Sequence, residues 1–231
     1  MKRALIAGVL VVLASAVPAA SAAAKATTQP PGFQPLSSTA AAGLVVRNGF
    51  EPRPGNTKAN HAVPTKRALK AWRHTSKMPY ARKVDGRFTG TTDEILQWAA
   101  YKWGLDEDLL RAVAARESWW KQTTVGDGGD SFGLFQIRRP FHCTGKCSIA
   151  RRSTAFNADY YAGTVRAYFD GLMPWVGKRS HGTPYAAGDL WGSVGAWFAG
   201  RWWTGPAAGY IADVQARLAE RPWEKPYFLT G

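Results

Sequence analysis

One glutamate, Glu117, is the residue of this sequence best placed to do acid–base chemistry. It follows Leu110, Val113 and Ala114, which recur at helical spacing, so a helix through them carries Glu117 on the same core-facing side. A tryptophan pair comes two residues later. A carboxyl group partly buried among indole rings and helix backbone keeps its proton to higher pH than in water. Such a glutamate can act as a general acid, although its position alone equally allows a solvated side chain near a helix end.

A glycine-rich loop and a short apolar run follow this helix. Gly126, Gly128 and Gly129 precede an apolar segment from Phe132 to Ile137. Glycines permit tight turns and close approach of the backbone. A helix that ends in an acid, a turn-rich loop and a short buried segment can together build one wall of a cleft.

Two motifs in this region resemble a known family. ARESWW, which contains Glu117, is followed sixteen residues after the glutamate by GLFQI, residues 133–137. These segments resemble the lysozyme-like superfamily of peptidoglycan-cleaving enzymes, specifically the soluble lytic transglycosylases and the goose-type lysozymes. That family ends a helix with Glu-Ser and continues with Gly-Leu-Met-Gln-Ile/Val, so Phe135 replaces the usual methionine. The resemblance covers roughly residues 91–218 and implies a mainly α, lysozyme-like fold with a small hairpin or loop wall beside the cleft.

The resemblance also implies a reaction. In the lytic branch of the family, one glutamate protonates the glycosidic oxygen and then draws a proton from the C6 hydroxyl of the sugar, leaving a 1,6-anhydromuramic end. Glu117 is the residue expected to take both roles. Gln136 matches an amide that touches the substrate, and Ser131 lies where the glycan would approach the backbone. Trp119 and Trp197 are expected to contact the sugar, because indole faces stack on sugar rings.

Two departures leave alternatives open. GAWFAGRWW stands where the family has Ala-Tyr-Asn-Ala-Gly, so Trp197 and Phe198 replace a tyrosine and an asparagine. Asp127 matches the goose-type position that holds an attacking water, and a carboxyl separation of about 6.5 to 9.5 Å would suit inverting hydrolysis. The second aspartate of that family is Arg138 here, and Asp127 is also explained as a turn former. A goose-type hydrolase and a wall-binding module without activity are therefore the alternatives to a transglycosylase.

The composition indicates an exported protein with an anionic partner. The chain has 231 residues and a formal net charge of +14. Residues 1–24 are typical of a secretory signal peptide, with Lys2 and Arg3 before an apolar stretch and small residues at Ala-x-Ala spacing. We therefore expect a secreted or cell-wall-associated monomer that binds peptidoglycan strands and anionic wall polymers. No nucleic acid is expected, because zinc-finger and RNA-recognition signatures are missing, and no later segment is apolar enough to span a membrane.

The two cysteines, Cys143 and Cys147, predict a disulfide that closes a small loop in an exported chain. His142 lies beside them, but zinc prefers four ligands and the other histidines are scattered. The sequence therefore predicts no metal and no cofactor.

The remaining pattern divides the chain into segments. Residues 25–64 are rich in small and polar residues without periodicity, which predicts a disordered linker. Residues 65–90 form a basic lead-in that either grips an anionic surface or packs its aromatic residues on the domain. The folded domain is expected over 91–231, with helices over 91–104, from 105 or 106 through Glu117, over 155–172, 189–199 and 207–219, and a small hairpin within 126–137.

Overall fold

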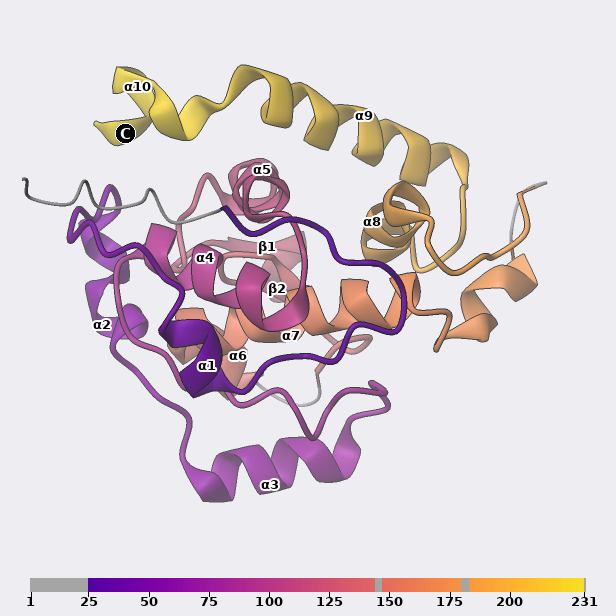
Figure 1. Cartoon of the computed structure of the whole chain (residues 1–231), viewed down its shortest axis with the longest axis horizontal. Coiled ribbons are helices and arrows are strands. Elements are labelled where there is room, and N and C mark those ends of the chain that lie inside the picture. The colour runs from indigo at the N-terminus through magenta and orange to yellow at the C-terminus, as the bar shows by residue number, and fades with distance from the viewer. Residues whose placement is uncertain (1–24, 144–146, 180–182, 231) are drawn as a thin grey trace, which may run out of the picture.

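The computed structural model describes residues 25–143, 147–179 and 183–230 (Figure 1). The described chain is mainly helical and includes one small sheet, which confirms the predicted mainly α fold with a small hairpin. The helices are α1 (Ser38–Ala42), α2 (Thr57–Asn60), α3 (Lys66–Thr75), α4 (Thr92–Trp103), α5 (Glu107–Ser118), α6 (Ser148–Arg152), α7 (Thr154–Phe169), α8 (Leu190–Ala199), α9 (Gly205–Glu220) and α10 (Pro226–Leu229). Short 3-10 turns are η1 (Pro54–Asn56), η2 (Asp127–Gly129), η3 (Pro174–Arg179) and η4 (Pro222–Glu224).

The ends of α4 and α5 follow from capping residues in the sequence. Thr91 and Glu94 form the predicted capping box at the start of α4, and Gly104 ends the helix with a left-handed backbone. Asp106 caps α5 by accepting a hydrogen bond from the backbone N–H of Leu109. The short connection between them fixes α5, and with it Glu117, against α4.

The core is built around α7. Every residue of this helix is buried, and it packs against α4 on one side and α8 on the other. Helix α9 lies across α5 and α8 at the upper edge of the view in Figure 1. This arrangement brings α9 onto the end of α5 that carries Glu117.

The sheet has three short antiparallel strands, β1 (Val125–Gly126), β2 (Ser131–Phe132) and β3 (Ile137–Arg138), in the order β1-β2-β3. Val125 pairs with Phe132, and Phe132 pairs with Ile137. The strands enclose the glycine-rich turn and the GLFQI segment, so the predicted hairpin is confirmed.

The prediction of a disordered linker over residues 25–64 is wrong. This segment forms α1, η1 and α2 and runs over the helical domain. Ala41 and Asn56 are buried, and Glu51 accepts hydrogen bonds from the backbone N–H of Thr92 and from the side chain of Asn60. Tertiary hydrogen bonds order these residues, and a sequence without periodicity gives no sign of them.

The basic lead-in packs its aromatic residues on the domain, which was one of its two interpretations. Trp72 of α3 meets Phe156 of α7 edge-on, with ring centroids 5.1 Å apart. The Tyr80 hydroxyl donates to Asp170 at 2.6 Å. Helix α3 therefore stands on the domain and turns its cations outward.

The predicted signal peptide, residues 1–24, lies outside the described residues. In the part of the chain that the structure describes, none of the helices combines the length and the apolar character needed to cross a bilayer.

Candidate active site

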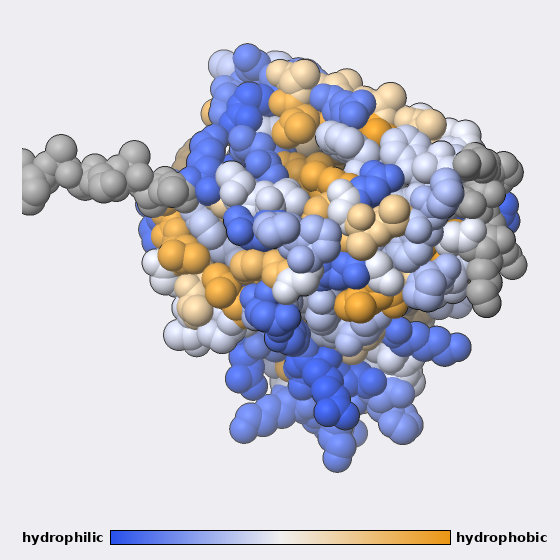
Figure 2. Space-filling view, turned by 45° about the vertical axis from the view of Figure 1, so that its right-hand side comes forward, coloured by the Kyte–Doolittle hydropathy of each residue, from blue (hydrophilic) through white to orange (hydrophobic). Residues whose placement is uncertain are grey.

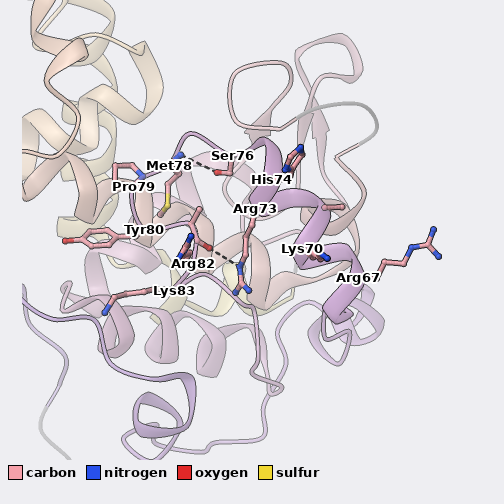
Figure 3. A pocket seen from close by; sticks show the side chains of 12 residues that line it. Arg67, Lys70, Arg73, His74, Ser76, Met78, Pro79, Tyr80, Arg82 and Lys83 are labelled. Carbon is pink, nitrogen blue, oxygen red and sulfur yellow. Dashed lines mark hydrogen bonds between the residues drawn. The ribbon is translucent and has the colours of Figure 1, made fainter.

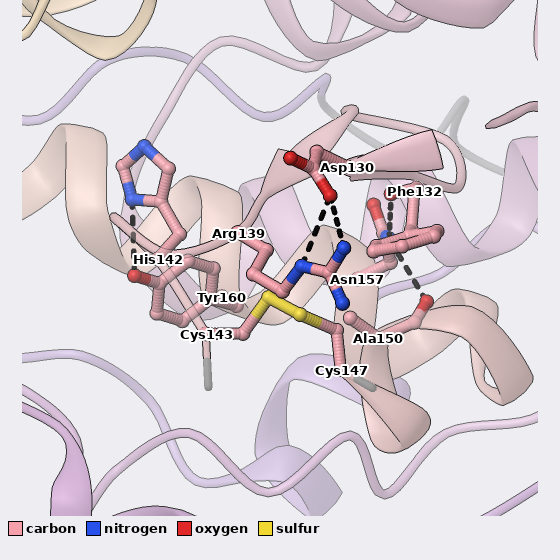
Figure 4. The surroundings of a disulfide bond; sticks show 9 residues. All are labelled: Asp130, Phe132, Arg139, His142, Cys143, Cys147, Ala150, Asn157 and Tyr160. Atoms are coloured by element: carbon pink, nitrogen blue, oxygen red, sulfur yellow. Dashed lines mark hydrogen bonds and ion pairs between the residues drawn. A yellow bond between two sulfur atoms is a disulfide. The ribbon is translucent and has the colours of Figure 1, made fainter. Parts of the chain in front are cut away.

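Glu117 lies in the last turn of α5, where the helix meets the hairpin. The hydroxyl of the next residue, Ser118, donates to the carbonyl of Leu134 at 2.8 Å. Asn157 of α7 holds the hairpin from the other side, because its amide oxygen accepts from Phe135 N–H and its Nδ2 donates to the Phe132 carbonyl (Figure 4). These bonds fix the loop and its candidate residues beside the carboxyl group of Glu117.

The Glu117 side chain is only 7% exposed. The Tyr210 hydroxyl donates to its Oε1 at 2.5 Å, and Arg116 Nη1 lies 3.9 Å from its Oε2. Burial raises the pKa of Glu117 to about 7, and the nearby charge of Asp127 raises it further. Hydrogen bonds with Tyr210 and Trp197 and the charge of Arg116 act in the opposite direction. The carboxyl group can therefore hold or release a proton near neutral pH.

Tyr210, on α9, is a site residue that the sequence patterns do not single out. Its ring stacks on Phe198 with centroids 4.7 Å apart, and the Arg116 guanidinium lies over the Tyr210 ring at 4.6 Å. Tyr210 thus supplies a hydroxyl to Glu117 in a chain where Trp197 replaces the tyrosine expected from the resemblance. That replacement was the signal that could have prompted a search for another hydroxyl.

A second tyrosine, Tyr161 of α7, also belongs to this cluster. Its ring stacks on Phe135 at 4.1 Å and meets Trp197 edge-on at 5.0 Å. Burial and the charge of Glu117 raise the pKa of Tyr161. Its buried hydroxyl has no hydrogen-bond partner within the described part of the chain, which leaves a polar atom near Glu117 to bond with a ligand or water.

Asp127 lies on η2 with a left-handed backbone, φ 49°. Its Oδ2 accepts a hydrogen bond from the Ser131 hydroxyl at 2.5 Å and lies 3.4 Å from Arg138 Nε, while 46% of its side chain is exposed. Because the charge of Asp127 raises the pKa of Glu117, the two carboxyl groups act on each other. The structure thus places Asp127, Ser131 and Glu117 in one region, with the Ser131 hydroxyl occupied by Asp127.

Gln136 ties the two ends of the hairpin together. Its Nε2 donates to the carbonyls of Gly133 at 2.9 Å and Thr124 at 3.3 Å. Its Oε1 lies against Gly126 so closely that a Cβ at that position would clash. A side chain at position 126 would displace the Gln136 amide, which braces the loop that carries Asp127.

The two predicted sugar-contacting tryptophans lie in different surroundings. Trp197 is only 5% exposed and is packed between His142, at 4.3 Å, and Tyr161. Trp119 ends α5, and its ring packs against Phe228 at 4.8 Å and Tyr227 at 6.3 Å in the C-terminal segment. Trp197 therefore joins the Glu117 cluster, whereas the ring of Trp119 serves the contact between α5 and α10.

The predicted disulfide is present between Cys143 and Cys147, whose Cα atoms are 5.4 Å apart (Figure 4). His142 Nδ1 lies 3.2 Å from the Tyr160 hydroxyl. Burial lowers the pKa of His142 to about 4, so its ring is neutral at pH 7 and packs on Trp197. Among the described residues, His, Cys, Asp and Glu form no group of three that could hold a metal.

Comparison of this chain with protein-family models, with curated proteins and with solved structures finds no match.

Proposed function

We propose that this protein is an exported enzyme that cleaves the β-1,4 bond between N-acetylmuramic acid and N-acetylglucosamine in peptidoglycan, as a lytic transglycosylase of lysozyme-like fold. The observation that carries this proposal is the environment of Glu117. A carboxyl group that is buried, bonded to a tyrosine hydroxyl and poised near neutral pH is suited to give a proton and take one back.

The reaction needs a single acid of this kind. Protonated Glu117 gives its proton to the glycosidic oxygen as the bond between that oxygen and C1 of the muramic sugar breaks. The C6 hydroxyl oxygen of the same sugar then bonds to C1, and its proton passes to the Glu117 carboxylate. The products are a free hydroxyl on one strand and a 1,6-anhydro ring on the other, and no water is consumed.

The cluster around Glu117 supports this cycle. Tyr210 and Trp197 hydrogen-bond the carboxyl group and favour its ionised form, which is needed between the two proton transfers. Gln136 would bind the N-acetyl group only after exchanging one of its bonds within the hairpin.

A goose-type hydrolase is the second candidate, and the interaction of Asp127 with Glu117 favours it. In that mechanism Asp127 would activate a water on the opposite face of the sugar. Its Oδ2 instead accepts a hydrogen bond from Ser131 and lies 3.4 Å from Arg138 Nε, so this oxygen is already engaged within the loop. We therefore place the transglycosylase first.

Product analysis tests both candidates. Digestion of purified peptidoglycan by the protein should release muropeptides with anhydro ends, one water lighter in mass spectrometry than the reducing ends a hydrolase would give. Glu117→Gln should lower the rate at least about 100-fold, because it removes the acid and keeps the shape. Glu224→Gln, at an exposed glutamate, is the matched control. Equal rates for Glu117→Gln and the parent protein would overturn the proposal.

A further inference from the structure

A basic cavity lies on the side of the molecule away from Glu117. In Figure 1, α3 is at the lower edge and α9, which carries Tyr210, is at the upper edge, with α4 and α7 between them. The space-filling view shows a strongly hydrophilic surface over the same lower edge (Figure 2). This cavity is therefore separate from the candidate active site.

The cavity measures about 920 Å³ and lies between α3 and residues 76–83 (Figure 3). Its lining includes six side chains that are cationic or can become so, namely Arg67, Lys70, Arg73, His74, Arg82 and Lys83. Residues 66–83 contain seven lysines and arginines and no acidic residue. Within the described chain, none of these six forms an ion pair with a carboxylate.

The walls of the cavity are held in place by contacts with the domain. Arg73 Nη2 donates to the carbonyl of Val84 at 2.8 Å and joins α3 to the opposite wall. The Tyr80 hydroxyl anchors that wall on Asp170, whose charge is paired with Arg166. The backbone that carries the cations is thus held in place before any ligand binds, which reduces the entropic cost of binding.

The lining favours an anionic ligand, and it lacks features by which proteins bind two other polyanions, membranes and single-stranded nucleic acids. Of residues 66–83, all of which the structure describes, none is a large exposed apolar side chain of the kind that inserts into an anionic bilayer. The rings of Trp72 and Tyr80 pack on the domain, so they offer nucleobases no platform for stacking. A polymer of phosphates without bases or lipid tails needs neither an exposed apolar side chain nor a stacking ring for binding.

We infer that this cavity binds a linear polyol-phosphate polymer of the bacterial wall and holds the protein on its substrate. Arg67, Lys70 and His74 lie about one helical turn apart along α3, a spacing that lets successive phosphates of a linear chain meet successive side chains. Lysine and arginine make charge-assisted hydrogen bonds with phosphate oxygens. The identity of the polymer rests on the proposed function, which places the protein in the wall, whereas the anion site rests on the cavity alone.

The test is binding of a fluorescent poly(glycerol phosphate) oligomer to the purified protein, followed by anisotropy at several salt concentrations. The cavity variant is Lys70→Gln/Arg82→Gln/Lys83→Gln. The matched control is Lys58→Gln/Lys121→Gln/Lys225→Gln, which removes three exposed cations elsewhere and gives the same net charge. Each phosphate contact contributes about 0.7 to the steepness of the plot of log affinity against log salt concentration. The cavity variant, which loses three such contacts, should therefore show a slope that is shallower by about 2. The control should keep the slope of the parent protein.

The outcomes separate the inference from the proposed function. Equal losses in the two triple variants would reduce the effect to net charge and overturn the inference. Tighter binding to anionic vesicles or to a single-stranded oligonucleotide than to the polyol phosphate would also overturn it. Glu117→Gln should bind the oligomer like the parent protein, and the cavity variant should digest polymer-free peptidoglycan at the parent rate, so either proposal can fail alone.

Discussion

The pKa of Glu117 is set by influences that oppose one another. Burial disfavours the ionised carboxylate, whereas Tyr210, Arg116 and Trp197 favour it. The result is a pKa of about 7, against an ordinary value of 4.5. Because each partner contributes separately, changing one partner should move the pKa without removing the acid.

Tyr210→Phe is expected to shift the pH dependence of the reaction upward. The change removes the hydroxyl that bonds Oε1 and keeps the ring that stacks on Phe198. A hydrogen bond to a charged group contributes about 1.5 kcal/mol or more, so the pKa of Glu117 should rise by about one unit. The fall in activity at alkaline pH, where the acid loses its proton, should move up by the same amount in initial rates of muropeptide release.

Tyr227→Phe is the control for this shift, because that exposed tyrosine bonds Glu220 at the C-terminal segment. Its pH profile should match that of the parent protein. If the fall in activity at alkaline pH occurs at the same pH in Tyr210→Phe and in the parent protein, the Tyr210 hydrogen bond does not affect the pKa of Glu117.

Glu117 should also make the protein less stable as pH rises. The pKa of Glu117 is about 7 in the folded chain, against the ordinary value of 4.5 that applies in the unfolded chain. The folded state binds more protons between these values, so its stability falls with pH across that window. Above pH 7, the free energy of unfolding should be lower than below pH 4.5 by about 3 kcal/mol from this group. Glu117→Gln, which cannot ionise, should match the parent protein below about pH 4.5 and exceed its free energy of unfolding by about that amount above pH 7 in urea titrations. An equal pH dependence in both proteins would contradict the raised pKa.

At the scale of elements, the sequence predicts those helices whose ends carry local signals. Thr91 and Gly104 mark α4 because capping and left-handed termination depend on residues within one turn. The contact between Tyr210 and Glu117 joins residues 93 positions apart, and no local pattern encodes it. The sequence could therefore indicate Glu117 and its loop as a candidate site, but it could not indicate the hydroxyl that bonds Glu117.

The ordered N-terminal segment illustrates the same limit. Asn56 is 1% exposed, donates to Thr92 and to the Trp120 carbonyl, and accepts from the backbone N–H of Gln122. A single asparagine thus links the start of α4 with the chain that leaves α5. Only the folded chain brings these groups together, so the lack of periodicity in this polar segment wrongly predicts a linker.

Asn56→Ala is expected to destabilise the protein by about 2 to 3 kcal/mol. It leaves the buried Trp120 carbonyl and the Gln122 N–H without this partner, and each unsatisfied group costs about 1 kcal/mol or more. The Thr92 hydroxyl keeps its bonds with Asn60 and Glu51. Asn48→Ala, at an exposed asparagine, should change stability by about 0.5 kcal/mol or less. Urea unfolding of both variants measures the difference. Equal small effects would mean that residues 25–64 contribute little to the fold.

At the scale of the whole molecule, one buried charge network joins segments that are far apart in sequence. Lys102 of α4 is 1% exposed and pairs with the fully buried Asp159 of α7 at 2.7 Å. Its Nζ also lies 3.0 Å from Asp85 and donates to Ser38 of α1 at 3.1 Å. The N-terminal segment (residues 25–64), the basic lead-in (residues 65–90) and the helical core therefore meet at the Lys102 ammonium group.

Lys102→Met should therefore weaken the whole fold. The variant preserves much of the side-chain volume but leaves the Asp159 carboxylate buried without its cation, and breaking such a pair costs about 3 to 5 kcal/mol. Because the network joins α1, α4 and α7, the loss should lower the midpoint of a single cooperative unfolding transition, followed by circular dichroism in urea. Lys121→Met, at an exposed lysine, should leave the midpoint nearly unchanged. A separate unfolding transition at lower urea concentration in Lys102→Met would instead mean that the N-terminal segment, residues 25–64, unfolds independently of the core.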